Sequence, residues 1–139
     1  MLTALTVFVD TGIFVALHNA DDSFHLRSKE LVGQALSGDF GRMYTSDYVI
    51  DEAVTIALVR TRKYELAQDL GSHIISSARI TKIFVNEEIF QNAWKKFVTL
   101  KDKALSFTDC TSLAIMETKK IKQILSFDSD FDGLTKRIS

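Results

Sequence analysis

Short apolar segments rich in β-branched and aromatic residues alternate with segments of helical periodicity along the chain. The run Ala4 to Val9 (ALTVFV) is the first, and similar runs follow at Arg42 to Thr45, Ile80 to Val85 and Ile121 to Phe127. Strands separated by helices form right-handed βαβ units, whose strands are parallel. The pattern predicts an α/β fold with a central, mainly parallel sheet. With 139 residues and 46% hydrophobic content, the chain suits a single domain over residues 1–139.

Helical segments lie between the predicted strands. Their expected ranges are 11–20, 22–36, 47–60, 64–77, 87–100 and a last helix that Ser106 opens. Ser46 or Asp47, Asn86 and Ser106 belong to the residue types that cap helix N-termini. The helix after Asn86 carries Trp94 on an apolar stripe, which we assign to the core or to a dimer interface rather than to the stacking of bases.

The charge balance excludes a general attraction to polyanions. The chain has 17 Lys and Arg against 18 Asp and Glu, so a phosphate-bearing partner must be held by local charge or by a metal. Its single cysteine, Cys110, cannot form an internal disulfide, and no signal-peptide pattern is present. No apolar run approaches the roughly 20 residues that span a bilayer. These features predict a cytoplasmic protein with no membrane partner.

Two carboxylates directly follow predicted strands. Asp10 ends the first strand in FVDTGIF, and Asp128 follows the last, where ligand sites of open parallel sheets form. The D-T-G triplet also occurs in aspartic proteases, but those need an all-β fold with two such loops. A phosphatase of the haloacid-dehalogenase type would need a second acid where Gly12 stands. We interpret Gly12 as giving room for a tight turn from strand to helix.

Two further acids lie on predicted helices. By helical angle, Glu52 projects among apolar neighbours and Asp51 lies at the edge of a narrow polar sector, so we favour Glu52 as the inward acid. Asp109 shares a helix face with Leu113 and should also lean inward. It stands in the N3 position of a capping box with Ser106, which is an alternative explanation for its presence.

Each acid also has a structural explanation of its own. Asp10 could cap the next helix, Glu52 could pair with a lysine or arginine, and Asp128 or Asp130 could be turn residues. Together, however, carboxylates that converge on one sheet edge would repel and raise one another's pKa. A hard cation resolves this conflict, and oxygen ligands without His or Cys indicate Mg²⁺ or Mn²⁺. Such an ion activates water and offsets charge during phosphodiester hydrolysis.

The segments VDTG, SDYVIDEAVT and LSFTDCTSLAIMETKKIKQILSFDSDF, in this order, resemble the PIN domain family, and above all its toxin-like (VapC-type) ribonucleases. The resemblance implies a three-layer α/β/α sandwich. It also implies an acidic quartet around Mg²⁺ or Mn²⁺, made of Asp10, Glu52, Asp109 and Asp128. Thr11 and Thr108 match positions that often keep a hydroxyl near the site, and Asp130 ranks below Asp128 as a substitute or supporting residue.

The resemblance further implies the function. It predicts a metal-dependent endoribonuclease that cleaves single-stranded RNA, forms a homodimer and is inhibited by a small antitoxin protein whose tail occupies the active-site groove. The competing hypothesis is a PIN-like module of weak activity that binds RNA or a protein. Many relatives also continue past a motif like FDSDFDGL into a final strand, which here can only be short, because the chain ends at Ser139.

Overall fold

A computed structural model describes residues 4–139, and its centre is a five-stranded sheet. The strands are β1 (Thr6–Val9), β2 (Arg42–Ser46), β3 (Ile80–Ile83), β4 (Gln123–Leu125) and β5 (Lys136–Ile138). Their order is β3-β2-β1-β4-β5, and all four neighbouring pairs are parallel. The chain first builds outward from β1 to β3 and then returns to the other side of β1. The order therefore reverses between β1 and β4, where ligand sites form in open sheets.

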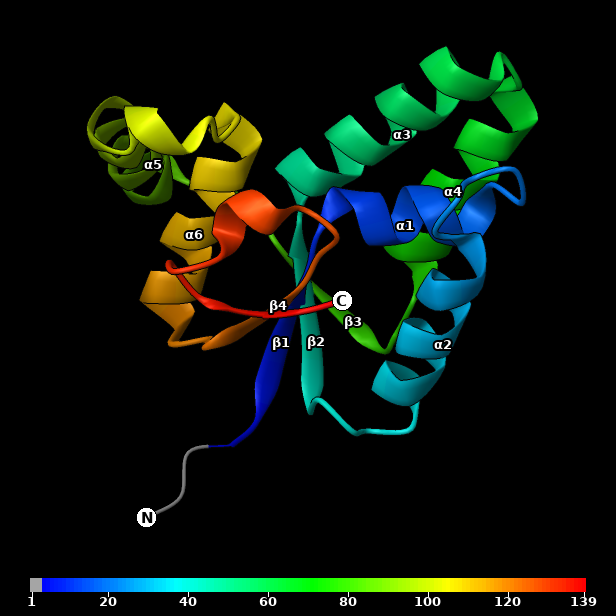
Figure 1. Cartoon of the computed structure of the whole chain (residues 1–139), viewed down its shortest axis with the longest axis horizontal. Coiled ribbons are helices and arrows are strands. Elements are labelled where there is room, and N and C mark those ends of the chain that lie inside the picture. Colours follow the sequence, from blue (N-terminus) through cyan, green and yellow to red (C-terminus); the bar gives the residue numbers. More distant parts are fainter. Residues whose placement is uncertain (1–3) are drawn as a thin grey trace.

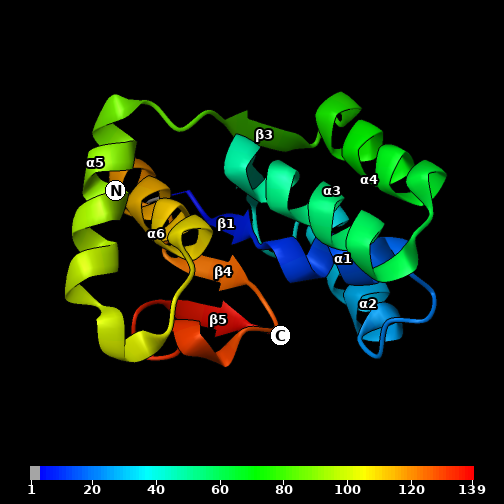
Figure 2. The same cartoon turned by 90° about the horizontal axis from the view of Figure 1, so that it is seen from above.

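Helices cover both faces of this sheet. They are α1 (Thr11–His18), α2 (His25–Leu36), α3 (Asp47–Thr61), α4 (Tyr64–Ser76), α5 (Glu87–Thr99) and α6 (Phe107–Lys119). Helices α5 and α6 lie on one side of the sheet and α1 to α4 on the other, as Figures 1 and 2 show. The predicted three-layer α/β/α sandwich is confirmed. Within residues 4–139 no helix is both long and apolar enough to cross a membrane.

Side-chain caps fix where three helices begin. Ser46 caps α3 by accepting a backbone N–H at 3.1 Å, and Asn86 caps α5 in the same way at 2.8 Å. Asp47, the alternative cap for α3, instead accepts the backbone N–H of Val85 at 3.0 Å. Ser106 opens α6 with a capping box. These caps confirm the predicted helix starts at residues 47, 87 and 107.

The predicted elements are longer than those observed at several ends. Ile121 lies before β4 rather than in it, because its backbone N–H closes the end of α6 by donating to Met116 at 2.9 Å. Helix α2 begins at His25 rather than at Asp22, because the Asp22 side chain accepts the N–H of Phe24 and forms a turn. In both places a local hydrogen bond, and not the hydrophobic pattern, determines the residue at which the element begins.

The aromatic stripe of α5 is not part of the core. Trp94 is 53% exposed and stacks on Phe97 with ring centroids 5.7 Å apart, and both rings lie near Phe107. The interpretation of Trp94 as a core residue was wrong, because α5 forms the outer edge of its layer and buries only the face that carries Ile89 and Ala93. The dimer-interface interpretation stays a prediction.

Gly12 is not required for the turn after β1, contrary to the sequence interpretation. Its φ is not positive, and a Cβ atom added there would meet nothing nearer than the Phe127 ring at 3.9 Å. Gly41 is different. It has φ of 77°, and a Cβ atom there would lie 1.9 Å from the backbone oxygen of Leu5.

We therefore predict that Gly41→Ala destabilises the protein, by about 2 kcal/mol or more, because the backbone must shift where β2 begins beside β1. Gly33→Ala is the matched control, since Gly33 is exposed in α2 and an added Cβ meets nothing within 4 Å. The control should leave stability unchanged or raise it by about 0.5–1 kcal/mol. Urea unfolding of both variants measures the difference. Equal stabilities would show that the approach to Leu5 is not a constraint.

Candidate active site

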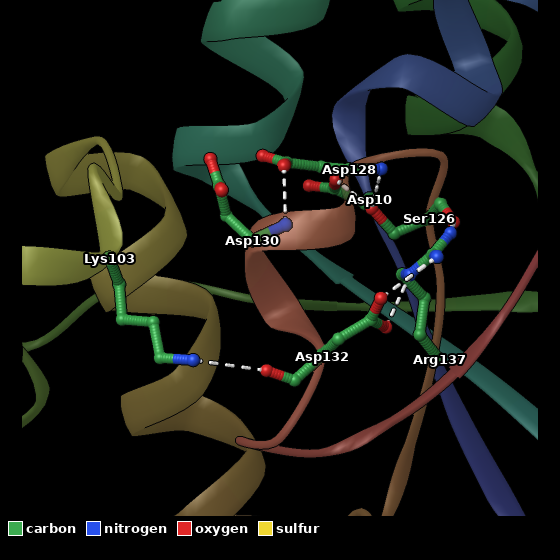
Figure 3. Close-up of polar contacts among 7 residues, drawn as sticks. All are labelled: Asp10, Lys103, Ser126, Asp128, Asp130, Asp132 and Arg137. Atoms are coloured by element: carbon green, nitrogen blue, oxygen red, sulfur yellow. Dashed lines mark hydrogen bonds and ion pairs between the residues drawn. The ribbon is translucent and has the colours of Figure 1, made fainter.

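The ends of β1 and β4 are joined through one buried serine. The Ser126 hydroxyl donates to Oδ2 of Asp10 at 2.7 Å and accepts the backbone N–H of Asp128 at 3.0 Å. Asp10 is further tied to β4 because its N–H donates to the Leu125 carbonyl at 3.0 Å. Figure 3 shows Asp10, Ser126 and Asp128 side by side. Sequence reasoning missed Ser126, which lay inside the predicted strand 121–127, although a hydroxyl two residues before Asp128 was a usable signal.

Asp10 is a buried carboxylate with one oxygen unpaired. It is 5% exposed, and its Oδ1 atom has no hydrogen-bond partner among the described residues. The explanation of Asp10 as a side-chain cap of α1 was wrong, because no capping hydrogen bond forms. The pKa of Asp10 is raised to about 7, chiefly by burial; the hydrogen bond from Ser126 opposes this shift, and the nearby charge of Asp109 adds to it. An unpaired buried carboxylate oxygen is costly unless something binds it.

Asp109 serves the helix with one oxygen only. Its Oδ2 accepts the backbone N–H of Ser106 at 3.0 Å, while the Ser106 hydroxyl accepts the N–H of Asp109, which completes the capping box. Burial raises the pKa of Asp109 to about 6, with smaller contributions from the charges of Asp128 and Glu52. The capping explanation is correct, and it is compatible with a site role for Asp109 because the cap leaves Oδ1 unused.

Glu52 and Asp128 complete the acidic group. Glu52 is half-buried on α3 whereas Asp51 is exposed, and within residues 4–139 Glu52 forms no ion pair. Asp128 uses Oδ1 to accept the backbone N–H of Asp130 at 2.9 Å, which caps the short helix η2 (Ser129–Phe131). The turn explanation of Asp128 is thus correct for one of its oxygens.

The four predicted acids line one pocket of about 390 Å³. Its described lining consists of Asp10, Thr11, Gly12, Val15, Asp22, Phe24, Glu52, Ile56, Arg60, Ser106, Asp109, Phe127 and Asp128. The hydroxyl of Thr11 is buried there and has no hydrogen-bond partner among residues 4–139. Thr108 and Asp130 are half-buried and do not line the pocket, so the structure brings together the quartet and Thr11 but not these two.

The donor set fits a hard divalent cation in part. Carboxylate and hydroxyl oxygens are the ligands such ions prefer, and Oδ1 of Asp10 is buried and unpaired. In the described part of the chain, however, no three His, Cys, Asp or Glu side chains are arranged to hold an ion by themselves. This arrangement suits Mg²⁺ or Mn²⁺ better than Zn²⁺, since Mg²⁺ keeps several waters and also takes substrate phosphate oxygens.

The last strand supports the acidic loop from outside. Arg137 on β5 donates to both carboxylate oxygens of Asp132, at 2.8 and 3.1 Å, and to the backbone oxygen of Ser126 at 3.2 Å. Lys103 donates to the backbone oxygen of Asp132 at 3.2 Å (Figure 3). The strand is short, as predicted, yet it anchors both ends of the segment that carries Asp128. Sequence reasoning did not find Arg137.

The chain belongs to the PIN domain family, whose model matches residues 7–136. A VapC ribonuclease of Archaeoglobus fulgidus is 28% identical to it over 128 residues, which cover 91% of this chain and 80% of the relative. The 23S rRNA-specific endonuclease VapC20 of Mycobacterium tuberculosis is 31% identical over 127 residues, which cover 91% of this chain and 92% of the relative.

Solved structures agree with this assignment. The crystal structure of Mycobacterium tuberculosis VapC20, described as a sarcin-ricin loop cleaving toxin, has a TM-score of 0.81 at 29% identity and covers 92% of this chain and 94% of that one. VapBC2 from Rickettsia felis, bound to a DNA fragment from its promoter, has a TM-score of 0.67 at 14% identity, covers 96% and 98%, and shares the fold. The resemblance to toxin-like PIN ribonucleases, inferred from the sequence, is confirmed.

Proposed function

We propose that this chain is a metal-dependent endoribonuclease that hydrolyses phosphodiester bonds of single-stranded RNA and acts as a toxin. The observation that carries the proposal is the unpaired, buried oxygen of Asp10 in a pocket that three further predicted carboxylates line. Similarity to curated ribonucleases over 91% of the chain supports the same reaction class.

In this proposal Asp10, Glu52, Asp109 and Asp128 hold Mg²⁺ or Mn²⁺. Such an ion, when bound, supplies a water-derived nucleophile at neutral pH and neutralises charge on the scissile phosphate. The chain's own groups preset the carboxylates, because Ser126 fixes one oxygen of Asp10 and the capping box fixes one oxygen of Asp109. The Thr11 hydroxyl is the buried donor available to a water or phosphate in the pocket. Thr108 and Asp130 have supporting roles in this assignment.

Metal binding is expected to raise the midpoint of thermal unfolding. An ion that binds only the folded protein at 100 times its Kd stabilises it by about 2.7 kcal/mol, or roughly 8 °C for a chain of this size. The rise should be large at pH 8 and small at pH 5, because protons compete for Asp10 and Asp109, whose pKa values are about 7 and 6. Calorimetry with and without millimolar Mn²⁺ measures this. A shift equal at both pH values would contradict binding at these two acids.

Cleavage of a mixed-sequence, single-stranded RNA tests the substrate class. The protein should cut this RNA in the presence of Mn²⁺ and should leave the same sequence as a DNA strand intact. A protein that binds the RNA and never cuts it would support the competing hypothesis of a weakly active RNA-binding module. A protein that does neither would leave binding of a protein partner as its role.

We also propose that the chain forms a homodimer, acts in the cytoplasm and is inhibited by an antitoxin protein. The support for an antitoxin is the description of the related VapC20 as a toxin, since a cell that makes such an enzyme must restrain it. Light scattering tests the first part: a homodimer has twice the 15.6 kDa mass of one chain.

A further inference from the structure

We infer that the acidic pocket also contains a subsite for one nucleotide, in which Phe24 and Phe127 receive a base and Arg60 receives a phosphate. The inference rests on the proposed ribonuclease function and adds to it the means of holding the strand beside the carboxylates. All three residues line the same pocket as the four acids, and they come from three separate segments of the chain. The pocket's volume of about 390 Å³ exceeds the needs of a hydrated ion alone.

The two phenylalanines form a flat aromatic stack at the edge of the pocket. Their ring centroids are 4.3 Å apart and their planes differ by 10°. Phe127 is half-buried and directly precedes Asp128, whereas Phe24 is 47% exposed. A large ring that is backed by another ring and still open to solvent is the form of a stacking surface for an unpaired base.

The stack is held in place by its backbone. The Phe24 N–H donates to Oδ1 of Asp22 at 2.8 Å, and its carbonyl accepts the N–H of Ser28 at 2.8 Å. Phe127 lies between Ser126 and Asp128, which share a hydrogen bond. A base that stacks on Phe24 would therefore not have to order this segment first, and its position relative to Asp128 would be fixed.

Arg60 supplies the charge that the carboxylates lack. It lies on α3 eight residues after Glu52, on the same side of the helix, and it is the only cationic residue in the described lining, against five carboxylates. Within residues 4–139 its guanidinium group has no hydrogen-bond or ion-pair partner. A guanidinium group binds phosphate with fixed, two-pronged geometry, so Arg60 is available for a phosphate next to the scissile one.

The test is the binding of a labelled, mixed-sequence, single-stranded RNA to the Asp10→Asn protein in Mn²⁺, followed by fluorescence anisotropy. In this background, Phe24→Ala should weaken binding about tenfold. Phe24→Leu should weaken it similarly, because it keeps apolar cover over Phe127 but offers no ring. Phe24→Trp should restore binding. Arg60→Gln should lower the slope of log K against log salt by about 0.7, the value for one phosphate contact on a single strand.

Two exposed residues outside the pocket provide matched controls. Phe84→Ala removes an exposed ring from the segment after β3, and Arg62→Gln removes the same charge two residues from Arg60. Both should leave the dissociation constant unchanged, and Arg62→Gln should also leave the salt slope unchanged. Thermal unfolding of all variants separates lost contacts from lost fold, and the Leu and Trp variants of Phe24 keep the test valid if the Ala variant unfolds.

The outcomes separate the subsite from the proposed function. If wild type cleaves RNA but Phe24 and Arg60 variants bind it like their parent, the subsite is wrong and the ribonuclease stands. If wild type never cleaves RNA but these variants lose binding as predicted, the subsite stands and the ribonuclease falls. If RNA binding is equal in every variant and an added protein partner competes for the pocket, its occupant is a protein, and the inference is overturned.

Discussion

Asp10→Asn is expected to lower the rate of RNA cleavage by about 10³-fold or more, and Asp109→Asn by a similar factor. Removing a ligand charge from a metal-assisted site forfeits several kcal/mol of transition-state stabilisation, and each 1.36 kcal/mol is a factor of ten in rate. Asn keeps the shape of Asp and one side-chain oxygen. The Ser126 hydroxyl can therefore still donate to residue 10, and the Ser106 N–H can still donate to residue 109. The loss should therefore appear as lost activity and not as lost fold.

A neighbouring carboxylate serves as the matched control. Asp51 adjoins Glu52 but is exposed and does not line the pocket. Asp51→Asn should keep cleavage close to the wild-type rate in the same single-turnover assay. If Asp51→Asn proved as inactive as Asp10→Asn, the assignment of Glu52 as the inward acid of α3 would be wrong. An active Asp10→Asn protein would remove Asp10 from the site.

The same Asp10→Asn substitution is expected to stabilise the protein in the absence of metal at pH 8. The pKa of Asp10 is about 7 in the folded protein and 3.8 in its ordinary state. Above pH 7 the folded protein must hold a buried, charged carboxylate, at a cost of about 2–4 kcal/mol relative to the unfolded chain. Asn carries no charge and avoids this cost. Asp10 would then be a residue that the function requires but that lowers the stability of the metal-free protein.

The difference in stability between Asp10→Asn and wild type keeps the same sign at every pH, but its size depends on pH. Below about pH 3 Asp10 is protonated in both states, so wild type and Asp10→Asn should be equally stable. Between pH 4 and pH 7 the unfolded chain releases the proton first, so wild type should lose stability relative to the variant as pH rises. Urea unfolding in EDTA at pH 4 and pH 8 measures the difference. A stability difference between Asp10→Asn and wild type that is largest at pH 4 would contradict the burial of a charged Asp10. The same pH-dependent difference in the exposed control Asp51→Asn would contradict it as well.

The order and type of the elements were predictable because hydrophobic pattern and caps agreed. Asn86 and Ser106 cap the helices that the apolar periodicity predicted, and the β-branched runs became the strands. The ends were less predictable, since Ile121 is apolar and buried but closes α6 instead of joining β4. The placement of Trp94 in the core was wrong for a related reason, because an amphipathic stripe does not show how much of it a neighbouring helix will cover.

The candidate site was predictable where one element decided the placement. Asp10 and Asp128 follow strands, and the angle of Glu52 on α3 distinguished it from Asp51 without tertiary information. The groups that support the acids could not be inferred in that way. Ser126 acts by joining two strand ends, and Arg60 and Phe24 reach the pocket only because α3 and the start of α2 approach the loop after β4. Such relations depend on the packing of distant segments.

The most direct test of the account is metal add-back to EDTA-treated protein with a single-stranded RNA. Wild type without metal should not cleave the RNA, and Mn²⁺ or Mg²⁺ at millimolar concentration should restore cleavage, whereas Asp109→Asn should stay inactive at every metal concentration tested. Cleavage by the EDTA-treated wild type at the same rate as the metal-loaded protein would contradict the metal-dependent mechanism. Equal cleavage by wild type and Asp109→Asn would show that the acidic pocket is not the active site.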